Sequence, residues 1–216
     1  MTNLVVIVGA GGFGREVLEI FKCQNKISNI WGILGFIDED SRLRGKMING
    51  YPVLGDLGWF KEHDNKNLGC VCTIGECEAR SQVVERLQKI GVKYYNAIHP
   101  SVVMSEFVEL GNDVIIGAGS VLTANIKIGD HVHINLNTTV GHDTEIGDCC
   151  TINPMVAISG NCNIGRRTYI GSGTTVIQNI SVGSDSIVGA GSVVIRNLPS
   201  NVTACGVPAR VIKNRS

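Results

Sequence analysis

One spacing of apolar residues organises the second half of the chain. An aliphatic side chain returns at every sixth position without a slip in phase, at Ile98, Met104, Leu110, Ile116, Leu122, Ile128, Ile134, Val140, Ile146, Ile152, Ile158, Ile164, Ile170, Val176, Val182, Val188 and Val194. The residue two positions before it is usually small or β-branched, and the residue after it is often glycine. A helix repeats about every 3.6 residues and an exposed strand about every 2, so neither explains this pattern.

A period of six residues is typical of a parallel β-helix. We expect each hexad to supply one short strand and one corner, so that three hexads close a triangular coil around the aliphatic and small side chains. The corner glycines would permit a positive φ. Seventeen hexads make between five and six coils, enough to bury a continuous core. A β-sandwich is the alternative, but its strands vary in length and would break the phase.

The first part of the chain has a different pattern. Residues 3–9 predict a buried parallel strand, and residues 9–14 have the spacing G-x-G-x-x-G before a helical pattern that includes Val17 and Phe21. Such glycines allow a tight turn and let backbone N–H groups approach a phosphate at a helix N-terminus. The strand and helix around the motif make a nucleotide-binding loop the favoured interpretation.

Further elements complete a small α/β domain. Residues 31–38 and 69–74 predict two more strands, residues 79–91 predict an amphipathic helix, and another helix is expected to begin near residues 58–61. We count three or four strands, about one mononucleotide-binding half, which favours a nucleotide or nucleotide sugar over NAD. Asp38, at the end of the second strand, is expected to accept hydrogen bonds from a ribose or base, with a solvated turn as the alternative.

These patterns divide the chain into three parts. Residues 1–94 are predicted to form an α/β Rossmann-like mononucleotide domain that binds a nucleotide sugar. Residues 95–199 are predicted to form an all-β parallel β-helix, and residues 200–216 a C-terminal tail that caps the open end of the prism. Arg210 and Lys213 in this tail are candidates to meet a phosphate.

Composition excludes several classes of function. The chain of 216 residues has a net charge of zero and no run of Lys or Arg, so nucleic acid is not expected as a partner. It has no apolar stretch of roughly eighteen residues, so no membrane span is expected. The N-terminus predicts a strand and not a signal peptide, which favours a cytoplasmic protein. Among eight cysteines, Cys70, Cys72 and Cys77 lack zinc-ligand spacing, and no metal site is predicted.

His142 is the strongest candidate for acid–base chemistry. It follows Gly141 at a corner, where a side chain projects outside the prism. Histidine titrates near neutral pH, as a general base requires, and Asp143 or a carboxylate of a neighbouring chain would orient the ring. The competitors are the other histidines: His63, His99, His131 and His133. His131 and His133 are both expected to point outward, and plain surface residues are the alternative for either of them.

Several segments together resemble one enzyme family over almost the whole chain. They are VGAGGFGREV, GFIDED and CTIGE in the first part, and INLNTTVGHDTEIGD, AISGNCNIG, VGAGSVV and GVPARVI in the second. The chain is similar to the hexapeptide-repeat sugar acetyltransferases of the NeuD/PglD type, which are sialic-acid O-acetyltransferases and UDP-amino-sugar N-acetyltransferases. The N-terminal mononucleotide domain narrows the family, because the repeat alone is common to many acyltransferases.

The resemblance implies a left-handed β-helix, acetyl-CoA as co-substrate, and a homotrimer with its active site in the cleft between two prisms. His142 would be the general base and Asp143 its acidic neighbour. A backbone N–H near Gly160 would polarise the thioester oxygen. The matching acetyl-CoA positions are Asn135, Gly160 and Ala190, with Arg210 added for its charge. The matching nucleotide-sugar positions are Gly11, Gly12, Phe13, Arg15, Asp38 and Glu39, with Gly75 at their edge.

One position departs from the family pattern. Thr151 stands where relatives often carry a second histidine, so that histidine's contact with acetyl-CoA is not expected here. The expected function is N-acetylation of the amino group of a UDP- or GDP-linked 4-amino sugar, by direct attack on the thioester. O-acetylation of sialic acid or a related sugar is the alternative, and a non-catalytic nucleotide-sensing β-helix trimer is a more distant one.

Overall fold

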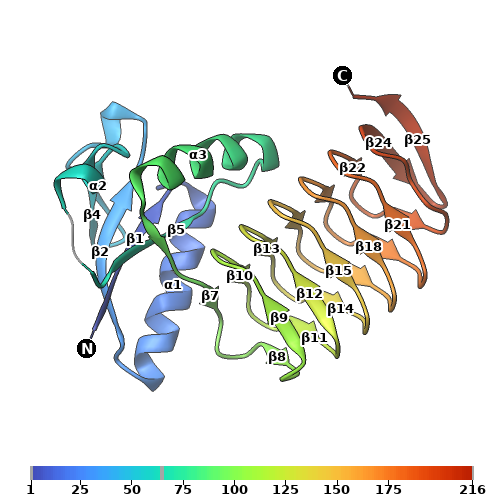
Figure 1. Cartoon of the computed structure of the whole chain (residues 1–216), viewed down its shortest axis with the longest axis horizontal. Helices are drawn as coiled ribbons and strands as arrows, with labels where there is room; N and C mark the ends of the chain where they lie inside the picture. The colour runs from blue at the N-terminus through green and yellow to red at the C-terminus, as the bar shows by residue number, and fades with distance from the viewer. Residues whose placement is uncertain (1, 64–65, 216) are drawn as a thin grey trace. The chain divides into compact units, whose positions relative to one another are not determined.

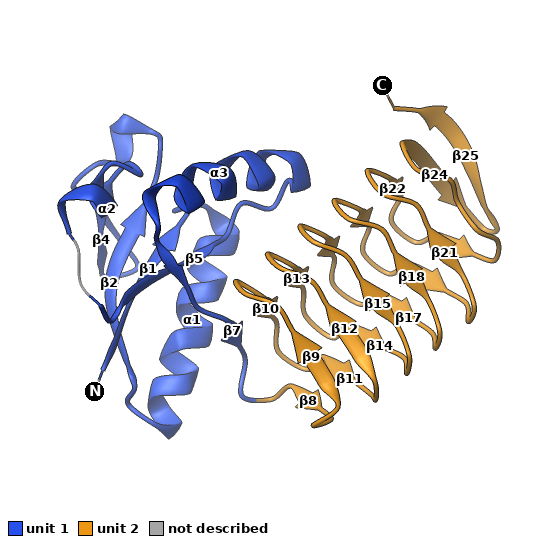
Figure 2. Ribbon diagram, viewed as in Figure 1, with its two compact units in different colours: residues 1–100 blue, residues 101–216 orange. Residues whose placement is uncertain are grey.

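The computed structural model describes residues 2–63 and 66–215. The chain forms two compact units, Met1–Pro100 (unit 1) and Ser101–Ser216 (unit 2), which are coloured separately in Figure 2. The domain boundaries expected after residues 94 and 199 stay predictions.

A six-stranded sheet forms the centre of unit 1 (Figure 1). Its order is β3-β4-β2-β1-β5-β6, in which β3 is antiparallel to β4 and all other neighbours are parallel. The strands are β1 (Asn3–Val8), β2 (Trp31–Ile37), β3 (Met47–Ile48), β4 (Tyr51–Gly55), β5 (Leu68–Cys72) and β6 (Lys93–Tyr94). The prediction of three or four strands was too low, because β3 and β6 have only two residues each and leave no periodic pattern.

Helices cover both faces of this sheet. They are α1 (Gly12–Ile27), the 3₁₀ turn η1 (Ser41–Leu43), α2 (Trp59–Glu62) and α3 (Cys77–Ile90). Val6 and Val8 pack with Phe60 of α2 and Leu87 of α3 in one buried cluster. Because side chains alternate along a strand, the other residues of β1 point to the opposite face, where α1 contacts β1 and β2.

The order of strands reverses between β1 and β5. From β1 the chain goes through α1 to β2 and β4 on one side, and then crosses to β5 and β6 on the other side of β1. In open parallel sheets, ligands bind outside the carboxyl ends of the strands at such a reversal. The glycine-rich loop leaves β1 at this place, which directs attention to residues 9–14.

Unit 2 is a three-sided parallel β-helix (Figure 1). Its first sheet contains β10 (Ile115–Ile116), β13 (His133–Ile134), β16 (Thr151–Ile152), β19 (Tyr169–Ile170), β22 (Ile187–Val188), β24 (Val202–Gly206) and β25 (Ala209–Asn214). Its second contains β8 (Val103–Met104), β11 (Val121–Leu122), β14 (Thr139–Val140), β17 (Ala157–Ile158), β20 (Thr175–Val176) and β23 (Val193–Val194). Its third contains β9 (Val108–Leu110), β12 (Ile126–Ile128), β15 (Glu145–Ile146), β18 (Asn163–Ile164) and β21 (Ser181–Val182). The preceding strand, β7 (Ala97–Ile98), ends unit 1.

The predicted inward positions form the core of unit 2. From Ile116 to Val194 every sixth aliphatic residue is at most 4% exposed, whereas Met104 is 37% exposed. Several buried hydroxyl groups donate to carbonyl oxygens of the next coil, as Thr138 Oγ1 does to Asn153 O over 3.1 Å. Such bonds allow small polar residues to alternate with valine inside the prism at little cost. Cys150 and Cys162, predicted as core residues, are buried at the same kind of position.

The corner glycines have a different role from the one expected. Positive φ angles occur three residues after each aliphatic position from Leu110 to Val188, and Asn, Asp or Gly occupies most of these places, as at Asn125 (φ 55°) and Asn161 (φ 55°). The glycine directly after the aliphatic does not adopt a positive φ. Instead, a Cβ on Gly171 would lie 2.5 Å from the backbone nitrogen of Ala190 in the next coil. Close stacking of coils therefore selects glycine here, and left-handed backbone selects Asn or Asp two residues later.

Candidate active site

Three glycines shape the loop between β1 and α1. Gly9 has φ +108°, which makes the tight turn. Gly14 lies so close to the carbonyl oxygen of Gly9 that no side chain fits between helix and strand. Gly11 is the N-cap of α1, and a Cβ built there would meet no atom within 4 Å. The loop is thus closed on two sides and open at Gly11, which is the arrangement that lets a phosphate approach the backbone.

Asp38 and Thr73 hold this loop in place. Asp38 Oδ2 accepts a hydrogen bond from Ala10 N over 2.9 Å, and its Oδ1 accepts one from Asp40 N over 2.9 Å. Thr73 Oγ1, at the end of β5, donates to the carbonyl oxygens of Val8 and Gly9 over 2.9 and 3.1 Å. One carboxylate oxygen of Asp38 therefore holds the glycine-rich loop, and the other holds the turn that follows β2. The role of Thr73 was not predicted, because this residue has no motif of its own.

The other predicted nucleotide-sugar residues lie near the same edge. Gly12 and Phe13 start α1, and Arg15 is exposed one turn further along it. Glu39 forms an exposed ion pair with Arg86 of α3, at 3.2 Å.

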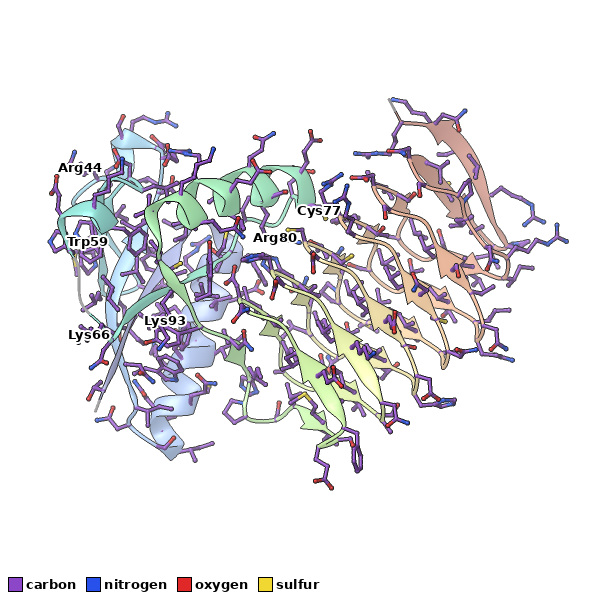
Figure 3. The ribbon with its side chains drawn as sticks, viewed as in Figure 1. Arg44, Trp59, Lys66, Cys77, Arg80 and Lys93 are labelled. Carbon is purple, nitrogen blue, oxygen red and sulfur yellow. The ribbon has the colours of Figure 1, made fainter. Side chains whose placement is uncertain are left out.

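Gly75 is exposed in the segment between β5 and α3. This segment is held by Arg80 of α3 (Figure 3), whose Nη1 donates to Ile74 O over 2.7 Å.

His142 and Asp143 form an exposed pair at a corner of unit 2. The corner connects β14 to β15, and His142 Nδ1 lies 2.7 Å from Asp143 Oδ2. Asn125, one coil earlier, donates its Nδ2 to Asp143 Oδ1 over 3.2 Å. These bonds lower the pKa of Asp143, first through His142 and then through Asn125. A carboxylate that stays ionised at Nδ1 favours the tautomer with a hydrogen there and a lone pair on Nε2.

The backbone around this pair is fixed by both neighbouring coils. Asp143 N donates to Ala124 O over 3.0 Å, and His142 O accepts from Asn161 N over 2.7 Å. The imidazole ring lies against Gly160, where a Cβ would come within 2.6 Å of Nε2. Gly160 therefore leaves room for the ring. Gly160 is itself a predicted acetyl-CoA position, and it lies next to Nε2, the candidate proton acceptor.

Two competing histidines are buried, contrary to expectation. His131 is 5% exposed and His133 is not exposed at all. His131 Nδ1 lies 2.8 Å from Asp113 Oδ2, so the chain has a second histidine–aspartate pair, but both of its side chains are almost inaccessible. Strand alternation predicts that these side chains point outward. The repeat does not indicate that other residues bury them. Among the three histidines of unit 2, His142 is the accessible one.

The remaining predicted acetyl-CoA residues lie away from His142 within one chain. Asn135 and Ala190 belong to the corner that connects the first and second sheets, whereas His142 and Gly160 belong to the corner that connects the second and third. The second sheet separates the two groups. Arg210 is exposed on β25, and its Nη1 donates to Ala209 O over 3.1 Å.

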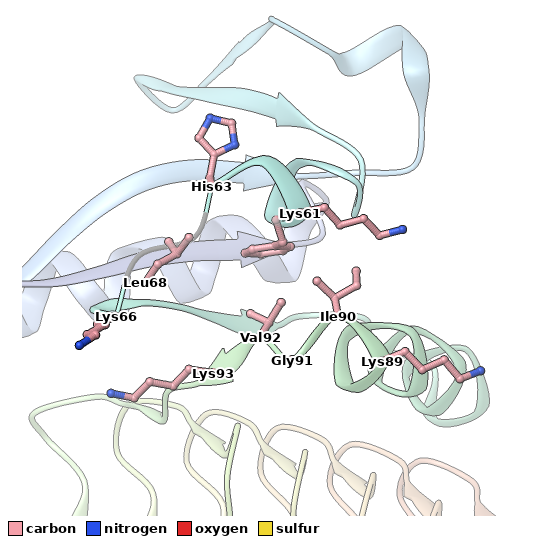
Figure 4. Close-up of a pocket in the computed structure, with 10 residues that line it drawn as sticks. Lys61, His63, Lys66, Leu68, Lys89, Ile90, Gly91, Val92 and Lys93 are labelled. Atoms are coloured by element: carbon pink, nitrogen blue, oxygen red, sulfur yellow. The ribbon is translucent and has the colours of Figure 1, made fainter.

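A pocket of about 630 Å³ lies elsewhere in unit 1 (Figure 4). Phe60, Leu68, Ile90 and Val92 line it together with Gly91, His63 and four lysines: Lys61, Lys66, Lys89 and Lys93. Structural reasons account for two of these charges, because Lys89 lies in the last turn of α3 and Lys93 Nζ lies 4.7 Å from the ring centroid of Tyr95. The pocket contains none of the predicted site residues.

In residues 2–63 and 66–215 no group of three or more His, Cys, Asp or Glu side chains is arranged to hold a metal ion. No helix within these ranges is long and apolar enough to cross a membrane.

Comparisons with known proteins agree with both units. Residues 4–87 match the model of the PglD N-terminal domain. GDP-perosamine N-acetyltransferase of Escherichia coli O157:H7 is 32% identical over 123 residues, which are 57% of this chain and 55% of that protein. The match thus spans about half the length of that curated relative.

Solved structures resemble the chain over nearly its whole length. A histidine-to-asparagine variant of perosamine N-acetyltransferase from Caulobacter crescentus, in complex with CoA and GDP-perosamine, is 33% identical with a TM-score of 0.91 and 99% of both chains covered. The acetyltransferase domain of PglB from Neisseria gonorrhoeae, also solved with acetyl coenzyme A, is 28% identical with a TM-score of 0.89, over 98% of this chain and 100% of that one. The chain belongs to the NeuD/PglD-like family of hexapeptide-repeat sugar acetyltransferases.

Proposed function

We propose that this protein transfers the acetyl group of acetyl-CoA to the amino group of a nucleotide-linked 4-amino sugar, with a GDP- or UDP-linked sugar as the substrate. The observation that carries the proposal is the exposed His142–Asp143 pair, whose Nδ1–Oδ2 distance is 2.7 Å. The bound GDP-perosamine and CoA of a relative at 33% identity support the choice of substrate class.

The chemistry follows from the orientation of the imidazole ring. With the hydrogen on Nδ1 directed to Asp143, the Nε2 lone pair accepts a proton from the sugar amine as its nitrogen attacks the thioester carbonyl. A C–N bond forms, the C–S bond breaks, and CoA leaves as the thiolate or thiol. Asp143 stabilises the imidazolium that results, because its lowered pKa keeps it ionised. Backbone N–H donors near Gly160 would stabilise the oxyanion.

Unit 1 would hold the nucleotide. The N-terminus of α1 has no side-chain cap and no acidic residue in its first turn. Backbone N–H groups and the helix dipole both favour an anion at such a position. Gly11 leaves the approach open, and Arg15 adds a positive charge one turn further along α1. A diphosphate of a nucleotide sugar fits this environment.

The site is expected to be completed by a second copy of the chain in a homotrimer. The outward side chains of the second sheet form an uncharged face, which consists of Val103, Val121, Thr139, Ala157, Thr175 and Val193. The third sheet instead presents Glu109, Lys127 and Glu145. The uncharged face has the His142 corner on one edge and the Asn135–Ala190 corner on the other. If copies of the chain pack on this face, the His142 corner of one copy would lie beside the Asn135–Ala190 corner of the next, with acetyl-CoA between them.

The proposal is tested by assaying thiol release from acetyl-CoA with GDP- and UDP-linked 4-amino sugars and with free sialic acid. Turnover is expected with a nucleotide-linked amino sugar, and His142→Ala is expected to lower kcat about 100-fold or more. If turnover occurs with sialic acid and with no nucleotide-linked amino sugar, the function is O-acetylation and not N-acetylation. Near-normal turnover of the His142→Ala variant would remove His142 from the mechanism.

A further inference from the structure

Asp143 belongs to a column of corner residues that repeat every eighteen positions. We call Asn125, Asp143, Asn161 and Asn179 the dyad column. All four have a positive φ, of 55°, 58°, 55° and 63°. Asn and Asp are the residues other than glycine that adopt this conformation most readily, so the backbone accepts either at each position. The acid at position 143 is therefore not a requirement of the fold.

Two side-chain hydrogen bonds run along this column in the same direction. Asn161 Nδ2 donates to Asn179 Oδ1 over 2.7 Å. Asn125 Nδ2 donates in the same way to Asp143 Oδ1, over 3.2 Å. An asparagine at position 143 would use its oxygen in this bond and turn its amide nitrogen elsewhere. Because position 143 is an aspartate, a second oxygen remains, and it is this Oδ2 that meets His142 Nδ1.

We propose that Asn125 is a positioning residue that holds the Asp143 carboxylate with Oδ2 toward His142 Nδ1, and so helps to keep the ring hydrogen on Nδ1. It acts only through Asp143. The inference rests on the proposed function, in which Nε2 must be free to accept the proton of the sugar amine. Its physical basis is that Asn125 Nδ2 donates to Asp143 Oδ1, which leaves Oδ2 for His142 Nδ1.

The Asp143→Asn variant shows the consequence most clearly. If Asn125 keeps its orientation and continues to donate from Nδ2, the oxygen of the new amide faces Asn125, and the amide nitrogen faces His142 and donates to Nδ1. The ring hydrogen then moves to Nε2, which can no longer accept a proton. We expect kcat to fall about 100-fold or more, with KM for acetyl-CoA little changed.

Exchanging the two side chains should reverse this orientation. In Asn125→Asp/Asp143→Asn the carboxylate at position 125 can only accept, so the amide nitrogen at position 143 turns toward it. The amide oxygen then faces His142 and restores the hydrogen to Nδ1. We expect kcat of the exchange variant to be at least about tenfold higher than kcat of Asp143→Asn. Aspartate tolerates the positive φ at position 125, so the exchange does not strain the corner.

Asn179 offers a matched control. It has the same backbone conformation in the same column, and its side chain pairs with Asn161 and not with Asp143. Asn179→Asp in the Asp143→Asn background is therefore expected to give no recovery. Equal recovery from Asn179→Asp, or none from Asn125→Asp, would overturn the inference.

The ¹⁵N spectrum of His142 gives a readout that does not depend on turnover. The hydrogen is expected on Nδ1 in the wild type, on Nε2 in Asp143→Asn, and on Nδ1 again in the exchange variant. An unchanged tautomer across the three proteins would also contradict the inference. The His142→Ala assay separates the two proposals. If His142→Ala is active, the proposed mechanism fails. If His142→Ala is inactive and the exchange variant recovers no activity, only the role of Asn125 fails.

Discussion

At the scale of residues, the site depends on a few side chains that the fold itself does not require. His142 is 67% exposed and Asp143 52% exposed, so neither contributes to the core. The sequence predicted their pairing, because adjacent corner residues both project outward. It also contained the signal for Asn125, since 125 and 143 are three hexads apart. That contact becomes predictable only when the coil length and the corner position of residue 143 are both known.

The titration of Asp143 provides a prediction at this scale. Its pKa is lowered, mainly by the hydrogen bond from His142 and secondly by that from Asn125. For a depressed carboxyl pKa, the favourable interaction is present above the ordinary value of about 3.9 and is lost as the pH falls through the folded-state value. A ¹³C NMR titration should place the Asp143 carboxyl below that ordinary value.

Two variants separate the causes of this shift. His142→Ala should raise the Asp143 pKa most, and Asn125→Gly, which keeps the positive φ, should raise it less. A midpoint at or above about 3.9 in the wild type would contradict the hydrogen-bond geometry.

At the scale of elements, the period was predictable and the reason for its glycines was not. Seventeen hexads in phase leave few folds to consider, because a one-residue slip would turn the core positions outward. The contact between Gly171 and Ala190, however, is between residues of neighbouring coils, and its tightness depends on how coils stack. Likewise, the two-residue strands β3 and β6 are defined by their pairing with β4 and β5 and not by a pattern of their own.

Two glycines of one corner test this account of the repeat. Gly171→Ala should reduce the free energy of unfolding by about 3 kcal/mol, the upper end of the usual cost of overpacking, because its Cβ would press on the backbone of Ala190. Gly173→Ala should cost about 1 kcal/mol, because only its φ of +68° is unfavourable and no atom lies within 4 Å. Urea unfolding compares the two; a larger loss for Gly173→Ala would refute the stacking explanation.

The glycine-rich loop offers a second matched pair. Gly14→Ala should lower the melting temperature, because its Cβ would collide with the carbonyl oxygen of Gly9. Gly11→Ala should lower the melting temperature less than Gly14→Ala, since the added Cβ meets nothing and alanine is only the poorer N-cap, and it should raise KM for the nucleotide sugar by obstructing the phosphate. Thermal unfolding and initial rates measure both effects. Normal KM in a folded Gly11→Ala protein would move the nucleotide site away from the start of α1.

At the scale of the whole molecule, the candidate residues do not meet within one chain. The sequence predicted each position by its match to the family pattern, which does not itself separate the corners, although the eighteen-residue coil assigns positions 142 and 160 to one corner and position 135 to another. The structure places Asn135 and Ala190 on one edge of the second sheet and His142 on the other. This separation, together with the uncharged face between the two edges, is what an active site shared by neighbouring subunits requires.

Substitutions on the uncharged face should therefore affect assembly and activity together. Thr139→Arg and Ala157→Arg are expected to convert a trimer to monomers and to abolish turnover, because a buried unpaired charge opposes packing. Asn163→Arg, at the exposed outward position of β18 in the third sheet, is the control and should leave both unchanged. Light scattering coupled to size exclusion measures the assembly. A trimer that survives the substitutions on the uncharged face would place the interface elsewhere.

The eighteen-residue coil also has a consequence for how the length of such a protein can change. Removing residues 165–182 would join Ile164 directly to Gly183, so that an aliphatic residue is again followed by glycine and every later column keeps its corner. The cut lies beyond His142, Asp143 and Gly160, and it leaves their coils intact. Such a deletion keeps the corner of every later residue, and it moves Ala190 and the tail one coil closer to His142. The length of unit 2 can therefore change in steps of one eighteen-residue coil while the His142–Asp143 pair keeps its corner.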